Sequence, residues 1–409
     1  MSKNVAIIGG GIAGLWSAWE LGRLGFESTI VERSPFLGGH VAGYACKATD
    51  RCRRCGACLL EDVVEKVTKS DQIKPLLRSE LFKIQRSNGG FALTVSQRPR
   101  RIFPEKCTDC GQCEEKCPQP GALVRSPLTN QLSVNEEVCL FFKNGSCRAC
   151  LEACPAAAVK LDGPVQDFEL ISSAVILSTG FKPFDPNLKP RFGYGRVPGV
   201  VTALELDAML RRDNWSSGEN IGSVAFIQCV GSRDAKIGRN YCSRVCCGYA
   251  LRLARLLKYR FPAIQPSMFY MDIQTYDRDF DRRLAEAARE VRLVRAIPGE
   301  VRLGQEGRPE VIYHGPEDRR VLESFDLVVL SVGISPHAAD LFGALAGLTC
   351  NSDGFLGGDG EDVTTKEEGV FVAGTIQGPR SISETVSHAI SAAGAVSSYF
   401  KKVDRGASR

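Results

Sequence analysis

The sequence lacks the features that mark membrane-spanning, exported and nucleic-acid-binding proteins. No window approaches the ~20 apolar residues of a membrane span, and the apolar run near the N-terminus is too short for a signal peptide. The 52 basic and 47 acidic residues leave a formal charge of only +5, which is a weak attraction for nucleic acid. Histidine is scarce, and none of the four residues has a setting typical of a catalytic triad. We therefore expect a cytoplasmic protein without a membrane span, a nucleic-acid partner or a catalytic general base.

Cysteine, in contrast, is abundant, with 17 residues. A reducing cytoplasm keeps thiols from pairing as structural disulfides, so we expect metal ligands. Sixteen of the cysteines form four groups of four, and the remaining Cys350 is expected in a loop without a role. The groups are Cys46, Cys52, Cys55 and Cys58; Cys107, Cys110, Cys113 and Cys117; Cys139, Cys147, Cys150 and Cys154; and Cys229, Cys242, Cys246 and Cys247.

The first 32 residues predict a dinucleotide-binding unit. Their apolar pattern indicates a strand at residues 4–8, a helix at 12–25 and a second strand at 27–31. Gly9 permits the tight turn, Gly11 lets the backbone approach a pyrophosphate, and Gly14 allows close packing of helix and strand. Glu32 is placed to accept a hydrogen bond from a ribose hydroxyl. The other predicted cofactor contacts are Ile12, Ala13, Arg33, Gly39, Thr179, Gly180, Gly374, Thr375 and Ser383.

Three later segments favour FAD over NAD. Residues 172–184 and 325–336 are apolar strands that end in a glycine turn, as in flavoprotein disulfide reductases. Residues 368–396 resemble the strand and helix that finish the FAD domain of that superfamily, with the positive end of the helix directed at the flavin. One departure is Gly374-Thr375, where the superfamily usually has Gly-Asp. This departure puts the usual contact to the ribityl chain in question.

Two cysteine runs predict an inserted ferredoxin-like module. They read "CTDCGQCEEKCP" and "CLFFKNGSCRACLEACP", the bacterial ferredoxin pattern given twice, in which the last cysteine of each run ligates the cluster of the other. The CxxxCP endings favour iron–sulfur over zinc. The segments on either side, "FALTV" and "DFELISSAVILSTG", read as strands of one sheet. We assign one 4Fe-4S cluster to Cys107, Cys110, Cys113 and Cys154, and a second to Cys139, Cys147, Cys150 and Cys117.

The group that begins at Cys46 has three open interpretations. The CxxCxxC spacing of Cys52, Cys55 and Cys58 suits three corners of a cubane, and Cys46 could provide the fourth ligand. A zinc site or a thiol pair that cycles beside the flavin would use the same residues.

The group from Cys229 to Cys247 lies where a second nucleotide-binding unit is expected. A strand ending at Gln228 is followed by Cys229 in place of a glycine-rich turn, and Cys246 and Cys247 lie at the start of a helix predicted to run to about Tyr259. A helix N-terminus stabilises a negatively charged cluster as it does a phosphate. We therefore expect iron and sulfur here in place of NAD, with Cys242 as the remaining ligand.

The motifs "IQCVGSRD" and "YCSRVCC" resemble the flavin-containing A subunit of heterodisulfide reductases, which has relatives in quinone-interacting and benzoyl-CoA reductase complexes. The resemblance covers nearly the whole chain. It implies a thioredoxin-reductase-like α/β fold with two dinucleotide-binding domains, FAD, and three or four 4Fe-4S clusters. It also implies a homodimeric core and partner redox subunits similar to heterodisulfide reductase B and C. Some members bifurcate electrons, but Arg252 stands where they usually have lysine.

These observations predict the following domain organisation and function. The FAD-binding domain comprises residues 1–98, 164–200 and 336–409, the ferredoxin-like insert residues 99–163, and the degenerate NAD-domain-like unit residues 201–335. We expect an oxidoreductase subunit that passes electrons between FAD and 4Fe-4S clusters within a larger complex. The alternative is a self-contained NAD(P)H-dependent flavin oxidoreductase similar to the small subunit of glutamate synthase. The missing second glycine-rich turn counts against this alternative.

Overall fold

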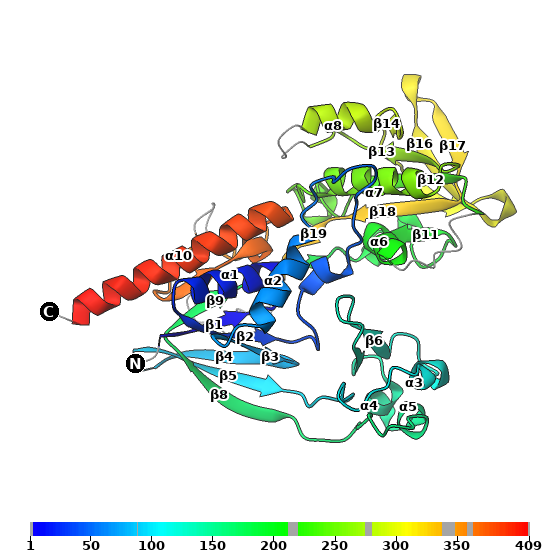
Figure 1. Cartoon of the computed structure of the whole chain (residues 1–409). Helices are drawn as coiled ribbons and strands as arrows, with labels where there is room; N and C mark the ends of the chain where they lie inside the picture. The colour runs from blue at the N-terminus through cyan, green and yellow to red at the C-terminus, as the bar shows by residue number, and fades with distance from the viewer. Residues whose placement is uncertain are drawn as a thin grey trace.

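The computed structural model describes residues 3–87, 89–211, 220–274, 280–337, 348–357 and 363–407. Figure 1 shows a central domain, a second domain above it and a small insert below the second domain. Helix α10 (Ile382–Ala407) runs along the central domain and ends at the C-terminus. Among the described helices, none combines the length and the apolar composition that crossing a bilayer requires.

The first domain is built on a parallel sheet with the strand order β20-β9-β1-β2-β3. Its elements are β1 (Asn4–Ile8), α1 (Ile12–Arg23), β2 (Glu27–Glu32), α2 (Leu59–Thr68), β3 (Ile73–Leu77), β4 (Ser79–Ser87), β5 (Gly90–Gln97), β8 (Gln166–Ser172), β9 (Ala174–Leu177), β20 (Val370–Val372) and α10. Side chains alternate along β1, so Val5 and Ile7 pack against α1 and α10, while Ala6 and Ile8 pack against a second sheet, β4-β5-β8. Burial on both faces requires the continuous apolar run that the sequence shows.

The insert leaves the first domain after β5 and returns as β8. These two strands pair antiparallel, with Gln97 opposite Gln166, so the predicted pairing on either side of the insert is present. The prediction of a single sheet was wrong for the end of the second segment, because β9 belongs to the parallel sheet β20-β9-β1-β2-β3. Its own core includes Ile102 and Val159, which form a bridge near its two ends. The elements are α3 (Gln112–Lys116), β6 (Leu123–Arg125), β7 (Leu132–Val134), α4 (Leu140–Asn144) and α5 (Ala149–Glu152).

The second domain has a parallel sheet with the order β11-β18-β12-β13-β14. Its elements are β11 (Val200–Thr202), α6 (Ala203–Arg211), β12 (Ser223–Val230), α7 (Cys246–Arg260), β13 (Gln265–Phe269), α8 (Phe280–Ala287), β14 (Arg292–Val294), the meander β15 (Glu300–Leu303), β16 (Pro309–His314) and β17 (Arg320–Ser324), and β18 (Leu327–Val332). The short strands β10 (Lys182–Pro183) and β19 (Ile334–Ser335) pair where the chain passes between the domains. Phe184 and Phe192 already pack in the core of the second domain, ahead of its first strand.

Two predicted boundaries differ from the structure by two residues. Helix α1 ends at Arg23 rather than at residue 25, because Gly25 has a φ of +83° that a helix cannot continue through. Strand β12 continues to Val230 rather than ending at Gln228, although its register shifts between Ile227 and Val230.

Candidate functional site

A large cavity of about 770 Å³ lies between the first and the second domain. The walls come from the loops after β1, β2 and β9, from the start of α10 and from the start of α7. Ten of the predicted cofactor contacts line it: Gly9, Gly11, Ile12, Ala13, Glu32, Arg33, Gly39, Thr179, Gly180 and Thr375.

The other three predicted contacts do not line the cavity. A Cβ on Gly14 would be 1.9 Å from the Gly9 carbonyl oxygen, so this glycine serves the packing of helix on strand. The N–H of Gly374 donates to Nδ1 of His388 at 2.9 Å, which also explains the buried position of that histidine. Ser383 is not part of the lining, and its neighbours Ser381 and Ile382 are.

The turn after β1 is shaped to hold a phosphate group. Gly9 has a φ of +109°, and a Cβ there would be 2.5 Å from the carbonyl oxygen of Ser178. A Cβ on Gly11 would meet nothing within 4 Å, so the backbone is open to the cavity at this point. Helix α1 begins directly after Gly11, and no side chain caps its first N–H groups. Uncapped N–H groups and the positive end of the helix dipole bind phosphate.

Glu32 stabilises this turn and also borders the cavity. One carboxylate oxygen accepts from the N–H of Gly10 at 2.6 Å and the other from the N–H of Ser34 at 2.7 Å. A carboxylate has further lone pairs, so Glu32 retains capacity to accept from a ribose hydroxyl.

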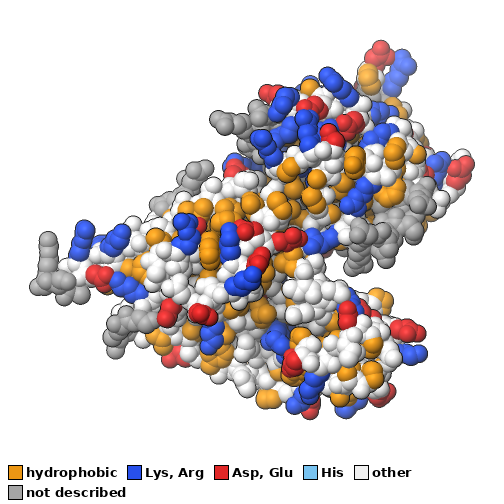
Figure 2. Space-filling model, viewed as in Figure 1, with side chains coloured by type: hydrophobic (Ala, Val, Ile, Leu, Met, Phe, Trp, Pro, Cys, Tyr) orange, Lys and Arg blue, Asp and Glu red, His pale blue; other side chains and the backbone are white. Residues whose placement is uncertain are grey.

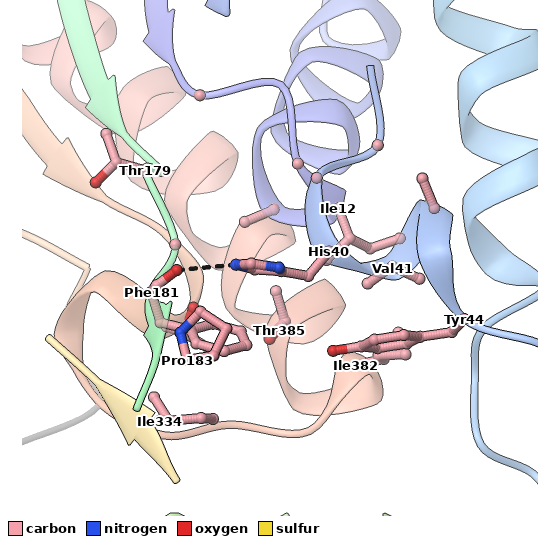
Figure 3. Close-up of a pocket in the computed structure, with 18 of the residues that line it drawn as sticks. Ile12, His40, Val41, Tyr44, Thr179, Phe181, Pro183, Ile334, Ile382 and Thr385 are labelled. Carbon is pink, nitrogen blue, oxygen red and sulfur yellow. Dashed lines mark hydrogen bonds between the residues drawn. The ribbon is translucent and has the colours of Figure 1, made fainter. Parts of the chain in front are cut away.

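His40 is a cavity residue that the sequence interpretation missed. Its Nε2 lies 3.0 Å from the carbonyl oxygen of Phe181, and its ring stacks on the Phe181 ring with 4.6 Å between centroids (Figure 3). Burial lowers the pKa of His40, and the charge of Arg33 lowers it further. A single histidine after two glycines carries no motif that would have indicated this position.

The cysteines predicted to form two crossed sets lie close to one another in the insert. Burial, together with neighbouring thiols, raises the pKa of the Cys150 thiol to about 11. These neighbours are Cys139, Cys117, Cys147 and Cys113. A separate small cavity is lined by Cys107, Cys110, Cys113 and Cys154. Crowded, partly desolvated thiols suit an iron–sulfur cluster, because its positively charged core binds them as thiolates.

The cysteines of the second domain meet where β12 ends and α7 begins. Cys229 has a positive φ of +58°, and burial together with Cys247 raises its pKa to about 12. Cys246 is the first residue of α7, is buried, and lines the large cavity. The N–H of Arg244 donates to Sγ of Cys242 at 3.2 Å. Four thiols at an uncapped helix start match the donor set and the electrostatics of an iron–sulfur cluster.

The cysteine segment, residues 46–58, lies between the two domains. Arg252 of α7 donates to the carbonyl oxygen of Arg53 at 3.4 Å, and Cys55 lines the large cavity. Cys46, Cys52 and Cys58 are exposed. Within the described ranges, no three histidine, cysteine, aspartate or glutamate side chains are arranged around the position of a single metal ion. The three interpretations of this segment stay open.

The insert also reaches the cavity. Pro127, at the tip of the β6–β7 hairpin, lines it, and Leu128 packs into the core of the first domain. Arg211 of α6 donates to the carbonyl oxygens of Pro127 at 2.8 Å and Tyr44 at 2.6 Å. All three parts of the molecule therefore meet beside one cavity. Figure 2 shows a notch between the insert and the second domain, with basic and acidic side chains interspersed on this face.

Two protein-family models match parts of the chain. An NAD(P)-binding Rossmann-like domain matches residues 7–63, and a 4Fe-4S binding domain matches residues 100–119. The first match includes the phosphate turn, and the second includes the first ferredoxin-type run.

Two curated proteins match nearly the whole chain. The A subunit of the H(2):CoB-CoM heterodisulfide,ferredoxin reductase of Methanothermobacter marburgensis is 32% identical over 423 residues, which cover 96% of this chain and 63% of that protein. The A subunit of the ferredoxin:CoB-CoM heterodisulfide reductase of Methanosarcina mazei is 33% identical over 414 residues, which cover 94% and 52%. Over nearly its whole length, the chain is therefore similar to the A subunits of heterodisulfide reductases. It spans between about half and two thirds of the length of these relatives.

Solved structures confirm the predicted fold class of the chain. The thioredoxin reductase of Lactococcus lactis has a TM-score of 0.57 at 15% identity and covers 98% of this chain and 99% of its own. The thioredoxin reductase of T. acidophilum has a TM-score of 0.56 at 14% identity, with the same coverage. The chain is thus a thioredoxin-reductase-like α/β protein with two nucleotide-binding-type domains and an inserted iron–sulfur module.

Proposed function

We propose that this chain is the FAD- and iron–sulfur-containing electron-transfer subunit of a heterodisulfide-reductase-like complex. One observation supports this most directly: the phosphate turn at Gly11 and the cluster ligand Cys246 border the same cavity. A dinucleotide that lies with its pyrophosphate at Gly11 and its adenosine at Glu32 extends toward Cys246. FAD would supply two-electron chemistry there, whereas iron–sulfur clusters exchange single electrons.

The chain's own residues position these groups. The α1 N-terminus and Glu32 bind the dinucleotide, and the start of α7 presents Cys246 and its three companion cysteines. The hairpin tip at Pro127 holds the insert, with its two crossed cysteine sets, against the same cavity. We propose four 4Fe-4S clusters, including one in the cysteine segment, and a homodimeric core that docks to further redox subunits.

The turn after β12 supports this proposal over the NAD(P)H-dependent alternative. Gly231 has a φ of +84°, and a Cβ there would be only 2.0 Å from the ring of Phe184. The aromatic ring therefore occupies the space over this turn, where a pyrophosphate would have to approach the backbone. Cys229 lies two residues before Gly231, close enough to Cys247 and Cys242 for their thiols to raise its pKa.

An anaerobic titration of the purified chain tests the proposal. The protein is titrated first with NADH and then with dithionite, while the flavin absorbance and the electron paramagnetic resonance of reduced clusters are followed. We expect no bleaching with NADH, full bleaching with dithionite, and about 16 iron atoms per chain if all four cysteine sets hold a cubane. Bleaching by stoichiometric NADH would favour the self-contained oxidoreductase, and a preparation without flavin and clusters would refute the proposal.

A further inference from the structure

A lysine is among the most deeply buried side chains of the described part of the protein. Lys47 is 1% exposed, and its ammonium group pairs with the carboxylate of Asp207, which is itself fully buried. It also donates to the carbonyl oxygen of Ala45 at 2.8 Å. The rings of Tyr44 and Tyr249 lie next to each other beside the ammonium group, with 5.6 Å between their centroids and each centroid 5.2 Å from the ammonium nitrogen. This charge is therefore held by contacts in several directions.

Asp207 comes from α6 of the second domain and fixes the lysine across the domain boundary. Its other hydrogen bonds come from the N–H of Ala45 at 3.0 Å and the hydroxyl of Tyr249 at 2.5 Å. Both carboxylate oxygens of Asp207 thus accept hydrogen bonds from protein donors. The segment that carries Lys47 also carries Cys46 and Cys55, so the ion pair connects the cysteine segment to the second domain.

The ion pair is oriented with its positive end toward the cavity. Lys47, Tyr44 and Tyr249 line the cavity, whereas Asp207 does not. Tyr249 lies one turn after Cys246 on α7, so its contact with the Lys47 ammonium group places this group near the start of α7. In the dinucleotide orientation proposed above, this is where the flavin ring would lie. Figure 3 shows Tyr44 beside Ile382, across from His40 and Phe181.

Stability does not explain why a lysine is buried here. Removing two charges from water costs more than their mutual attraction usually returns, and well-packed apolar residues often replace such a pair without loss of stability. In a site of low dielectric constant, however, one oriented charge acts strongly on a nearby group that gains or loses an electron. Reduction of a flavin adds negative charge to its ring, so a neighbouring ammonium group favours the reduced state.

We propose that the charge of Lys47, held just behind the cavity wall, raises the reduction potential of the flavin, and that Asp207 is a positioning residue that acts through Lys47. This inference rests on the proposed function, because it requires FAD in the cavity. It assigns the setting of the flavin potential to an ion pair between the cysteine segment and α6.

Opposite substitutions at the two ends of the ion pair test the inference. The flavin midpoint potential is measured by spectroelectrochemistry in the purified full chain, with FAD and iron content determined for each variant. Lys47→Gln removes the positive charge, so we expect a lower potential, equivalent to at least about a tenfold smaller equilibrium constant for flavin reduction. Burial already lowers the pKa of Lys47, so the potentials are compared at a pH low enough to keep its ammonium group protonated. Under this condition Asp207→Asn leaves the charged lysine without its counter-charge, so we expect a higher potential. Lys47→Arg keeps the charge and should stay near wild type.

A merely structural role would not produce shifts of opposite sign. If the pair only held the domains together, both variants would lose FAD or iron, and the potential of the flavin that remained would not change. Equal potentials in wild type and FAD-loaded Lys47→Gln, or shifts of the same sign in both variants, would overturn the inference. If Lys47→Gln does not retain FAD, Asp207→Asn and Tyr249→Phe still test the inference. Tyr249→Phe removes a hydrogen bond that partly offsets the negative charge of Asp207, so it should lower the flavin potential. Failure of the proposed function would differ, since wild type would then lack flavin or clusters.

Discussion

Arg211 is the side chain that joins the three parts of the molecule, and its removal should free the insert. Its two hydrogen bonds go to Pro127 of the insert and to Tyr44 of the first domain, and the side chain is 27% exposed. A hydrogen bond with a charged partner contributes about 1.5–3 kcal/mol when buried. Because this side chain is partly solvated, we expect Arg211→Ala to weaken the junction by about 2 kcal/mol in total. This corresponds to roughly thirtyfold more frequent opening.

Hydrogen–deuterium exchange measures this opening directly. We expect faster exchange at residues 126–130 and 44–47 in Arg211→Ala, with unchanged FAD and iron content and slower electron transfer between flavin and insert. Arg211→Lys keeps a donor for one carbonyl oxygen and should give an intermediate result. Arg23→Ala is the matched control, because Arg23 is exposed and pairs only with Glu20 on the same helix within the described structure. Unchanged exchange at the hairpin tip in Arg211→Ala would refute this account of the junction.

Four further substitutions probe the cofactor sites. Gly11→Val places a side chain in open space at the phosphate turn, so the chain should fold but be purified without FAD, as absorbance spectra would show; a yellow variant would contradict the phosphate assignment. Cys154→Ser should disturb the cluster of Cys107, Cys110 and Cys113, whereas Cys117→Ser should disturb that of Cys150, so their resonance spectra should lose different signals; identical losses would argue against crossed ligation. Cys246→Ser should leave FAD bound while slowing flavin-to-cluster transfer in a single turnover, and an unchanged rate would exclude Cys246 from the electron path.

Much of the fold could be predicted from the sequence because its signals are local. The strand, turn and helix of residues 4–23 follow from an apolar run, three glycines and a helical period, all within one stretch. The sheet that flanks the insert could also be predicted, since β5 and β8 each show strand composition. The cysteine sets of the insert are predicted from spacing alone, because the ferredoxin pattern specifies which residues share a cluster.

The junctions could not be predicted, because their partners are far apart in the chain. Lys47 and Asp207 are separated by 160 residues, and neither lies in a pattern that indicates burial. Arg211 and Pro127 are separated by 84 residues and meet through a backbone carbonyl, which no side-chain motif reveals. Charged side chains are predicted on the surface by default, so buried ion pairs between domains are where such reasoning fails.

The two nucleotide-binding-type domains show how one structural device can be adapted to different groups. In the first domain, Gly9 and Gly11 leave the start of α1 open, and uncapped N–H groups border the cavity. In the second domain, the corresponding turn is covered by Phe184, and the start of α7 carries thiols instead. Both helix starts offer a positive dipole end, and only the residues in front of it differ. Because Cys246 lines the cavity that α1 also borders, a dinucleotide held by the first helix start would lie next to a cluster held by the second.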